Sequence, residues 1–178
     1  MFDLFKKLLF SRQLSLEKGK VLLLGSPMCV TPASIFIDVQ KDLEKAIGKE
    51  KARKRIYEGS KKGGIKFAKK LFEAYKLKGE KLLRWEFDIV MLAGWGEFKM
   101  VNFDRNKKTM RVEVKNSPIA IGYGKSKTPV DCYIAGFAAG GATVAVGVPM
   151  KVKEIKCLTM GHRYCEFIAE PLKKSKIY

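Results

Sequence analysis

The sequence contains a single histidine, His162, among its 178 residues. Histidine is the side chain that most often acts as a general acid or base, so this scarcity leaves few ways to build a nucleophile–histidine couple. We expect His162 at an exposed turn, although its neighbours are candidate metal ligands and a metal role stays open. Gly94-Trp95-Gly96 is not a dinucleotide fingerprint, because it lacks the third glycine and the strand–helix context. The residues therefore favour a role other than catalysis.

The sequence also lacks any run of roughly 20 uninterrupted apolar residues, the length that a membrane-spanning helix requires. The stretch MFDLFKKLLF mixes charged and apolar residues and has no small-residue cleavage site, so we expect no signal peptide. A cytoplasmic location follows as the expectation. In that compartment the 4 cysteines are more often thiols or metal ligands than disulfides. No linker divides the chain, and we expect residues 1–178 to form one domain.

Acidic residues are few: 18 Asp and Glu stand against 36 Lys and Arg, a net charge of +18. Between Lys41 and Arg84 there are 13 Lys and 3 Arg against 6 acidic residues, so this segment alone carries +10. A positive surface favours nucleic acid or an anionic membrane surface as a partner. Because lysine reads bases poorly, any nucleic-acid binding by the 41–84 helices should be weak and non-specific. The alternative is the solvated face of amphipathic helices.

The first half of the chain predicts one strand followed by helices. The apolar run 21–24 is strand-like and stops at Gly25-Ser26-Pro27. Helical periodicity then begins at Pro32, places Ile35, Val39, Leu43 and Ile47 on one face, and ends at Gly48. Further helices are predicted over 51–57, 65–77 and 80–93, with Gly63-Gly64 breaking the first two apart.

The second half predicts two hairpins around a glycine-rich helix. Residues 98–103 and 110–114 form the first hairpin, and residues 150–155 and 164–168 form the second. Residues 130–146 are small and apolar, which indicates a buried helix, with a β structure open for its second half. We therefore expect an α/β chain of the α+β type, with N-terminal helices packed on an antiparallel sheet.

Three cysteines and one glutamate are candidate ligands for a structural zinc ion. Cys157 and Cys165 oppose each other across the second hairpin, where their sulfurs can share one tetrahedral ion. Glu154 reaches the same side only if a bulge or a strand end intervenes, and Cys132 can supply a fourth ligand. The alternative is a set of reduced thiols in an ordinary core. Cys29, in a loop, is expected to be a buried or unreactive thiol.

The run DCYIAGFAAGG…VKEIKCLTMGHRYCEF, from Asp131 to Phe167, resembles the 4-vinyl reductase domain, also called a hydrocarbon-binding domain. Its elements are a Cys at the start of a glycine-containing helix, then E-x-x-C, a turn with Gly, and a Cys followed by an aromatic. The earlier stretch Tyr57-Glu58-Gly59-Ser60-Lys61-Lys62-Gly63-Gly64 is also similar, so the resemblance covers most of the chain. It is greatest to an archaeal stand-alone member. It implies a fold shared with nitric-oxide-signalling and Golgi-transport proteins.

The resemblance also implies zinc at Cys132, Glu154, Cys157 and Cys165, beside a pocket for a small apolar ligand. Candidate pocket residues are Phe36, Phe67, Phe72, Trp85, Phe87 and Trp95, each of which could instead be plain core. A homodimer is expected, since relatives pair through helices and Phe2, Leu4, Phe5, Leu8, Leu9 and Phe10 would be hard for a monomer to cover. The functional expectation is a ligand-binding or sensory domain. A nucleic-acid-binding protein, or a reductase with an external cofactor, are the alternatives.

Overall fold

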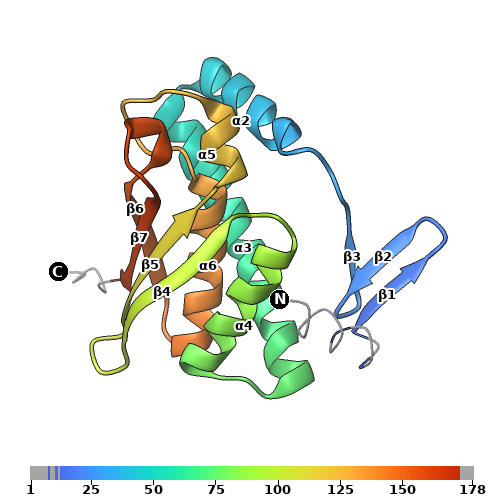
Figure 1. Ribbon diagram of the computed structural model, residues 1–178. Coiled ribbons are helices and arrows are strands. Elements are labelled where there is room, and N and C mark those ends of the chain that lie inside the picture. Colours follow the sequence, from blue (N-terminus) through green and yellow to red (C-terminus); the bar gives the residue numbers. More distant parts are fainter. Residues whose placement is uncertain (1–7, 9–10, 12, 173–178) are drawn as a thin grey trace.

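The computed structural model describes Leu8, Ser11 and residues 13–172. A small N-terminal sheet is followed by three helices, a hairpin, two helices and a second hairpin (Figure 1). The elements are β1 (Leu14–Glu17), β2 (Lys20–Leu23), β3 (Ser26–Met28), α2 (Ala33–Ile47), α3 (Lys49–Tyr75), α4 (Gly79–Leu92), β4 (Glu97–Asp104), β5 (Thr109–Lys115), α5 (Pro118–Tyr123), α6 (Cys132–Val146), β6 (Met150–Lys156), the 3₁₀ turn η1 (Leu158–Met160) and β7 (Cys165–Pro171). The predicted α+β class is confirmed.

The main sheet has four antiparallel strands in the order β4-β5-β7-β6. Both predicted hairpins are present, and β5 joins them by pairing with β7, from Met110 opposite Ala169 to Val114 opposite Cys165. Alternating residues of β5 and β6 are buried, which is the pattern of a sheet covered on one face. The helices lie on that face (Figure 1).

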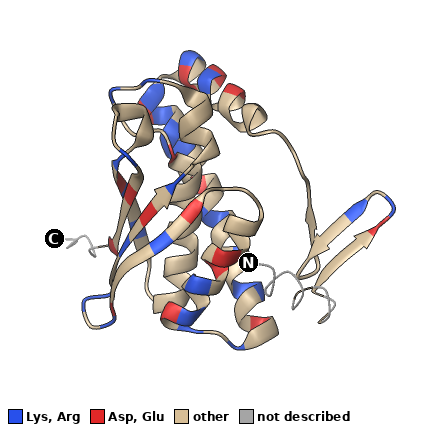
Figure 2. Ribbon diagram, in the orientation of Figure 1, with Lys and Arg blue, Asp and Glu red and all other residues tan. Residues whose placement is uncertain are grey.

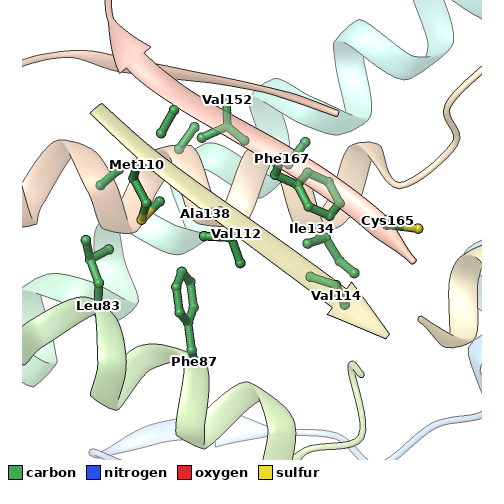
Figure 3. Packing of buried hydrophobic residues seen from close by; sticks show 14 of the residues in the cluster. Leu83, Phe87, Met110, Val112, Val114, Ile134, Ala138, Val152, Cys165 and Phe167 are labelled. Carbon is green, nitrogen blue, oxygen red and sulfur yellow. The ribbon is translucent and has the colours of Figure 1, made fainter. Parts of the chain in front are cut away.

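The core lies between the sheet and helices α4 and α6 (Figure 3). Val112, Val114 and Phe167 from the sheet pack with Ile134 and Ala138 of α6. Helix α6 is continuous from Cys132 to Val146, which excludes the β alternative for its second half. Its small residues let it sit in the middle of the fold, between the sheet and α3.

Helix α3 is unbroken from Lys49 to Tyr75, so the predicted break at Gly63-Gly64 is wrong. The reason is the crossing of α3 and α6. A Cβ at Gly64 would overlap the carbonyl oxygen of Phe137, and one at Gly136 would overlap the carbonyl oxygen of Tyr57. Glycine permits this close approach, and the packing gained offsets its low helix propensity, about 1 kcal/mol against alanine.

The N-terminal sheet β1-β2-β3 is an antiparallel meander of which sequence periodicity predicted only the strand at β2. It packs on α3 and α4, where Leu8, Leu23 and Leu24 form a second apolar cluster with Leu71 and Ile89. The other apolar residues used to predict a dimer, at positions 2, 4, 5, 9 and 10, lie outside the described residues. None of the described helices combines the length and apolarity needed to cross a membrane.

Candidate metal centre and apolar cavity

Four buried side chains converge where α6 begins beside the β6–β7 hairpin: Asp131, Glu154, Cys157 and Cys165. One ligand atom from each lies within 4.8 Å of the others. The two sulfur atoms are 3.7 Å apart. Two sulfurs on one tetrahedral ion, with zinc–sulfur bonds of about 2.3 Å, would be separated by roughly 3.8 Å. The geometry therefore fits a single metal ion.

A bulge places Glu154 on the same side as Cys157. Pairing between β6 and β7 runs regularly to Glu154 opposite Phe167, then shifts so that Lys156 is opposite Glu166. The extra residue is Ile155. In a regular strand Glu154 and Cys157 would face opposite sides, so the predicted need for a bulge is confirmed. The turn between the cysteines closes at Gly161, whose φ of 88° suits glycine.

Each of the two carboxyl groups at the centre has a hydrogen-bond partner for only one of its two oxygens. Glu154 Oε2 accepts a hydrogen bond from the backbone N–H of Asp131 at 2.9 Å, and Asp131 Oδ1 accepts one from Ser117 Oγ at 2.9 Å. The remaining oxygens, Glu154 Oε1 and Asp131 Oδ2, are buried without any hydrogen-bond partner. Buried polar atoms are rarely left in this state, and a cation in the centre would satisfy both.

The sulfur atoms have their own supporting donors. Thr159 Oγ1 donates to Cys157 Sγ at 3.1 Å, and the backbone N–H of Leu158 lies 3.4 Å from Cys165 Sγ. Such donors stabilise thiolates and orient metal ligands. They come from η1, so the turn between the two cysteines is part of the site.

Burial and mutual contact control the charge of this centre. Burial raises the pKa of Asp131 to about 7 and that of Glu154 to about 10. The hydrogen bond from the Cys165 thiol lowers the pKa of Cys157 to about 5 and raises the pKa of Cys165. Four anions this close repel one another, so a divalent cation would bind with release of protons. The donor set of two sulfurs and two oxygens could hold a metal ion.

Cys132 lies apart from this group. Its Sγ is 3.3 Å from Gln40 Oε1 on α2, and burial raises its pKa to about 12, which favours the neutral thiol. Of the four sequence-predicted ligands, the structure thus brings together Glu154, Cys157 and Cys165, with Asp131 in the fourth position. The sequence did not predict Asp131 as a ligand, because the neighbouring Cys132 was given the fourth position. His162, as expected, is exposed, and so is Cys29.

An apolar cavity of about 320 Å³ lies between α3, α4, α6 and the N-terminal meander. Three of the predicted pocket residues line it, namely Phe67, Phe87 and Trp95. The sequence did not predict its other aromatic lining residues, Phe98, Tyr133 and Phe137. Cavities of about 300–1,000 Å³ with mostly apolar walls are typical of small-molecule sites.

A neighbouring cavity of about 420 Å³ opens between the meander, α2 and the end of α4. Phe36 and Trp95 line it, with their ring centroids 5.4 Å apart. The last two predicted pocket residues, Phe72 and Trp85, line neither cavity. Trp85 packs on Tyr75 at 4.6 Å, and Phe72 lies under the ammonium groups of Lys76 and Lys78.

Sequence and structure comparisons agree with this architecture. Residues 110–171 match the 4-vinyl reductase domain. The matched segment contains all four residues of the metal centre and the α6 wall of the cavity, whereas Phe67, Phe87 and Trp95 precede it. No curated protein sequence matches the chain.

Three solved structures share the fold. The phenol-responsive sensory domain of the transcription activator PoxR, crystallised with phenol, has a TM-score of 0.84 at 19% identity, covering 99% of this chain and 92% of that one. A vinyl-4-reductase family protein from Methanocaldococcus jannaschii has a TM-score of 0.55 at 17% identity, covering 84% and 87%. A trafficking protein particle complex subunit 3 from Naegleria fowleri, covalently bound to palmitic acid, has a TM-score of 0.54 at 10% identity. The match covers 79% of this chain and 95% of that one. The expected likeness to a transport-complex fold is confirmed.

Proposed function

We propose that this chain is a ligand-binding or sensory domain for a small, mainly apolar molecule. The observation that carries the proposal is the cavity of about 320 Å³ between α3, α4 and α6. Its aromatic walls offer a large apolar surface, and burial of a ligand there would be favourable by roughly 25 cal/mol per Å². The PoxR sensory domain, which has the same fold and was crystallised with phenol, supports this choice of ligand class.

The polar groups of the cavity narrow the range of suitable ligands further. Tyr133 already uses its hydroxyl, which donates to the carbonyl oxygen of Phe36 at 3.2 Å. Among the described residues, none accepts a hydrogen bond from the indole N–H of Trp95. An aromatic ligand that carries one oxygen would pack on the phenylalanines and find Ser26, Ser60, Lys66 and Trp95 as polar lining residues.

We propose zinc as the ion of the metal centre, held by Asp131, Glu154, Cys157 and Cys165. Two thiolates and two carboxylates would close the tetrahedral shell with four protein ligands, and a closed shell is typical of a structural site. Zinc would join the loop before α6 to the β6–β7 hairpin. The chain's own groups orient the ligands, through Ser117 on Asp131 and Thr159 on Cys157.

We propose also that the chain works as a homodimer in the cytoplasm. Ile35 and Val39 are exposed by 52% and 56%, so the apolar periodicity of α2 lies partly on the outer surface instead of in the core, and Val30, just before α2, is exposed by 95%. A second copy could cover them. The four cysteines form no disulfide, and thiols or metal ligands are the usual states of cysteine in that compartment.

Calorimetric titration with phenol tests the ligand proposal. Gly63 lines the cavity and has open space around its Cβ position, so Gly63→Leu should fill the cavity entrance without moving the backbone. We expect wild type to bind phenol and Gly63→Leu to lose at least tenfold in affinity. Gly59→Leu is the matched control, because Gly59 has similar open space on the same helix but does not line the cavity. Absence of binding to wild type, or equal losses in both variants, would contradict the proposal.

A further inference from the structure

An open groove of about 1380 Å³ lies at the end of the molecule near the metal centre, between α2, the start of α3, the loop 124–128 and η1. Figure 2 shows Lys and Arg on these segments, with acidic residues also on α2. Five lysines line this lysine groove: Lys41, Lys45, Lys49, Lys125 and Lys127. The single acidic residue that lines it is Glu44.

Glu44 contributes little negative charge to the groove, because its carboxylate is buried and neutralised. Arg53 donates to Glu44 Oε1 at 2.7 Å, Tyr123 donates to Oε2 at 2.6 Å, and Gln40 donates to Oε1 at 3.0 Å. Burial alone would raise the pKa of Glu44, but these hydrogen bonds outweigh it and lower the pKa. The carboxylate therefore stays paired inside the wall, and the positive charges dominate the groove.

The two walls of the groove are held in place. The Arg53 guanidinium, which is bonded to Glu44 at the end of α2, also donates to Thr128 Oγ1 at 2.7 Å and to the carbonyl oxygen of Pro129 at 2.6 Å. The backbone N–H of Ser126 donates to the carbonyl oxygen of Thr159 at 3.0 Å. The lysine-bearing loop is thus fixed both to the helices and to η1, so its charges are preorganised.

The lysines themselves are available for a partner. Lys49, Lys125 and Lys127 are exposed and form no ion pair with any described residue. Lys45 pairs with Asp42 at 3.1 Å on the open surface, where ion pairs are weak and exchange readily. Lys41 lies 5.0 Å from the ring centroid of Tyr123.

We propose that the lysine groove binds the phosphodiester backbone of a nucleic acid. The cations are spread along the groove, with Lys41 and Lys45 one helical turn apart, about 6 Å along α2, and Lys125 and Lys127 on the opposite wall. This distribution suits an extended polyanion better than one small anion. Lysine ammonium groups contact phosphates as point charges.

Binding in the lysine groove does not read sequence. Tyr123 is its single aromatic lining residue, and Lys41 and Arg53 lie over that ring, so the groove offers little aromatic surface for a base to stack on. The proposed site therefore uses only Lys41, Lys45 and Lys49 of the 41–84 segment that composition indicates, together with Lys125 and Lys127.

Fluorescence anisotropy with a labelled single-stranded oligothymidylate and a duplex of the same length tests the proposal. The test variant carries Lys49→Gln, Lys125→Gln and Lys127→Gln. The control carries Lys62→Gln, Lys69→Gln and Lys99→Gln, three exposed lysines outside the groove, so both variants lose the same net charge. At low salt we expect the test variant to bind at least about tenfold more weakly than wild type. Its log affinity should also depend less steeply on log salt, by about 2 to 3 units, while the control stays near wild type.

The two oligonucleotides distinguish single-stranded from duplex nucleic acid as the ligand. Groove-dependent binding of either one supports the proposal. Equal losses in the two variants would overturn it, because the affinity would then follow net charge alone. Absence of binding at low salt would also overturn it. Polyglutamate competing as well as the oligonucleotide, with the same loss in the test variant, would overturn it in favour of an acidic protein partner.

Discussion

Asp131 and Cys132 are neighbours at the start of α6, yet only Asp131 faces the metal centre. We expect Asp131→Asn to weaken zinc retention by tenfold to a hundredfold or more, since an amide brings no negative charge but can still accept the hydrogen bond from Ser117. Cys157→Ser and Cys165→Ser should lose the metal and lower Tm. Elemental analysis with a competing chelator measures retention.

Cys132→Ser is the control for that series, because its thiol faces Gln40 and a hydroxyl fits the same contact. It should retain zinc as wild type does. Loss of zinc in Cys132→Ser together with full retention in Asp131→Asn would return the fourth position to Cys132.

Glu86 is a fully buried carboxyl group on α4 whose two oxygens have no hydrogen-bond partner. Burial raises its pKa well above the usual value. Above about pH 4.3 the unfolded chain releases this proton while the folded chain keeps it, so Glu86 makes the folded state less stable as pH rises. We expect Glu86→Gln to remove this loss. Between about pH 5 and 7, the free energy of unfolding of Glu86→Gln should increase relative to that of wild type by up to about 1.4 kcal/mol per pH unit.

Urea unfolding of the metal-loaded proteins across this pH range measures the effect. Glu73→Gln, at an exposed position of α3, should run parallel to wild type. A Glu86→Gln curve that also runs parallel to wild type would show that Glu86 does not stay protonated in the folded chain.

At the scale of elements, the crossing of α3 and α6 depends on glycines at matched positions. A Cβ at Gly140 would overlap the carbonyl oxygen of Lys61, so Gly140→Ala forces the helices apart and should cost about 1–3 kcal/mol or more. Gly63 lies in α3 with open space around its Cβ position, so Gly63→Ala should stabilise the protein by up to about 1 kcal/mol. Thermal unfolding compares the two, and a neutral Gly140→Ala would argue against the close crossing.

The elements that the sequence predicts well are those set by local pattern. Both hairpins follow from period-two alternation, and α6 follows from its run of small apolar residues. The continuity of α3 could not be predicted, because Gly63-Gly64 breaks an isolated helix and only contact with α6 compensates. Strands β1 and β3 of the meander were missed for the same reason, since these short strands depend on packing against α3 and α4.

The choice between Asp131 and Cys132 also depends on tertiary structure. Asp131 is the residue before α6 and Cys132 is the first residue of α6, so the rotation of α6, together with the backbone at Asp131, decides which one faces the hairpin. That rotation is fixed by the glycine contacts with α3, far away in sequence. The sequence identified the hairpin ligands, and three of its six predicted pocket residues, Phe67, Phe87 and Trp95, line the smaller cavity, but it could not give this rotation.

At the scale of the whole molecule, α6 connects the sites. The metal centre is at its start, and Ile134, Phe137 and Ala138 on its next turns line the smaller cavity. The loop 124–131 runs from the lysine groove to Asp131. A ligand in the smaller cavity that shifts α6 would therefore also act on the start of this helix, where the metal centre lies.

The exposed apolar face of α2 is the predicted interface of a homodimer. Ile35 and Val39 lie one turn apart and are both more than half exposed. If a second copy covers them, light scattering should give about twice the chain mass of 20.1 kDa over a wide concentration range. Val39→Lys should dissociate the dimer, because a charged group would be buried in the interface. Val101→Lys, at an exposed bulge of β4, should leave it intact. The monomer mass in wild type, or equal dissociation by both variants, would exclude α2 as the dimer interface.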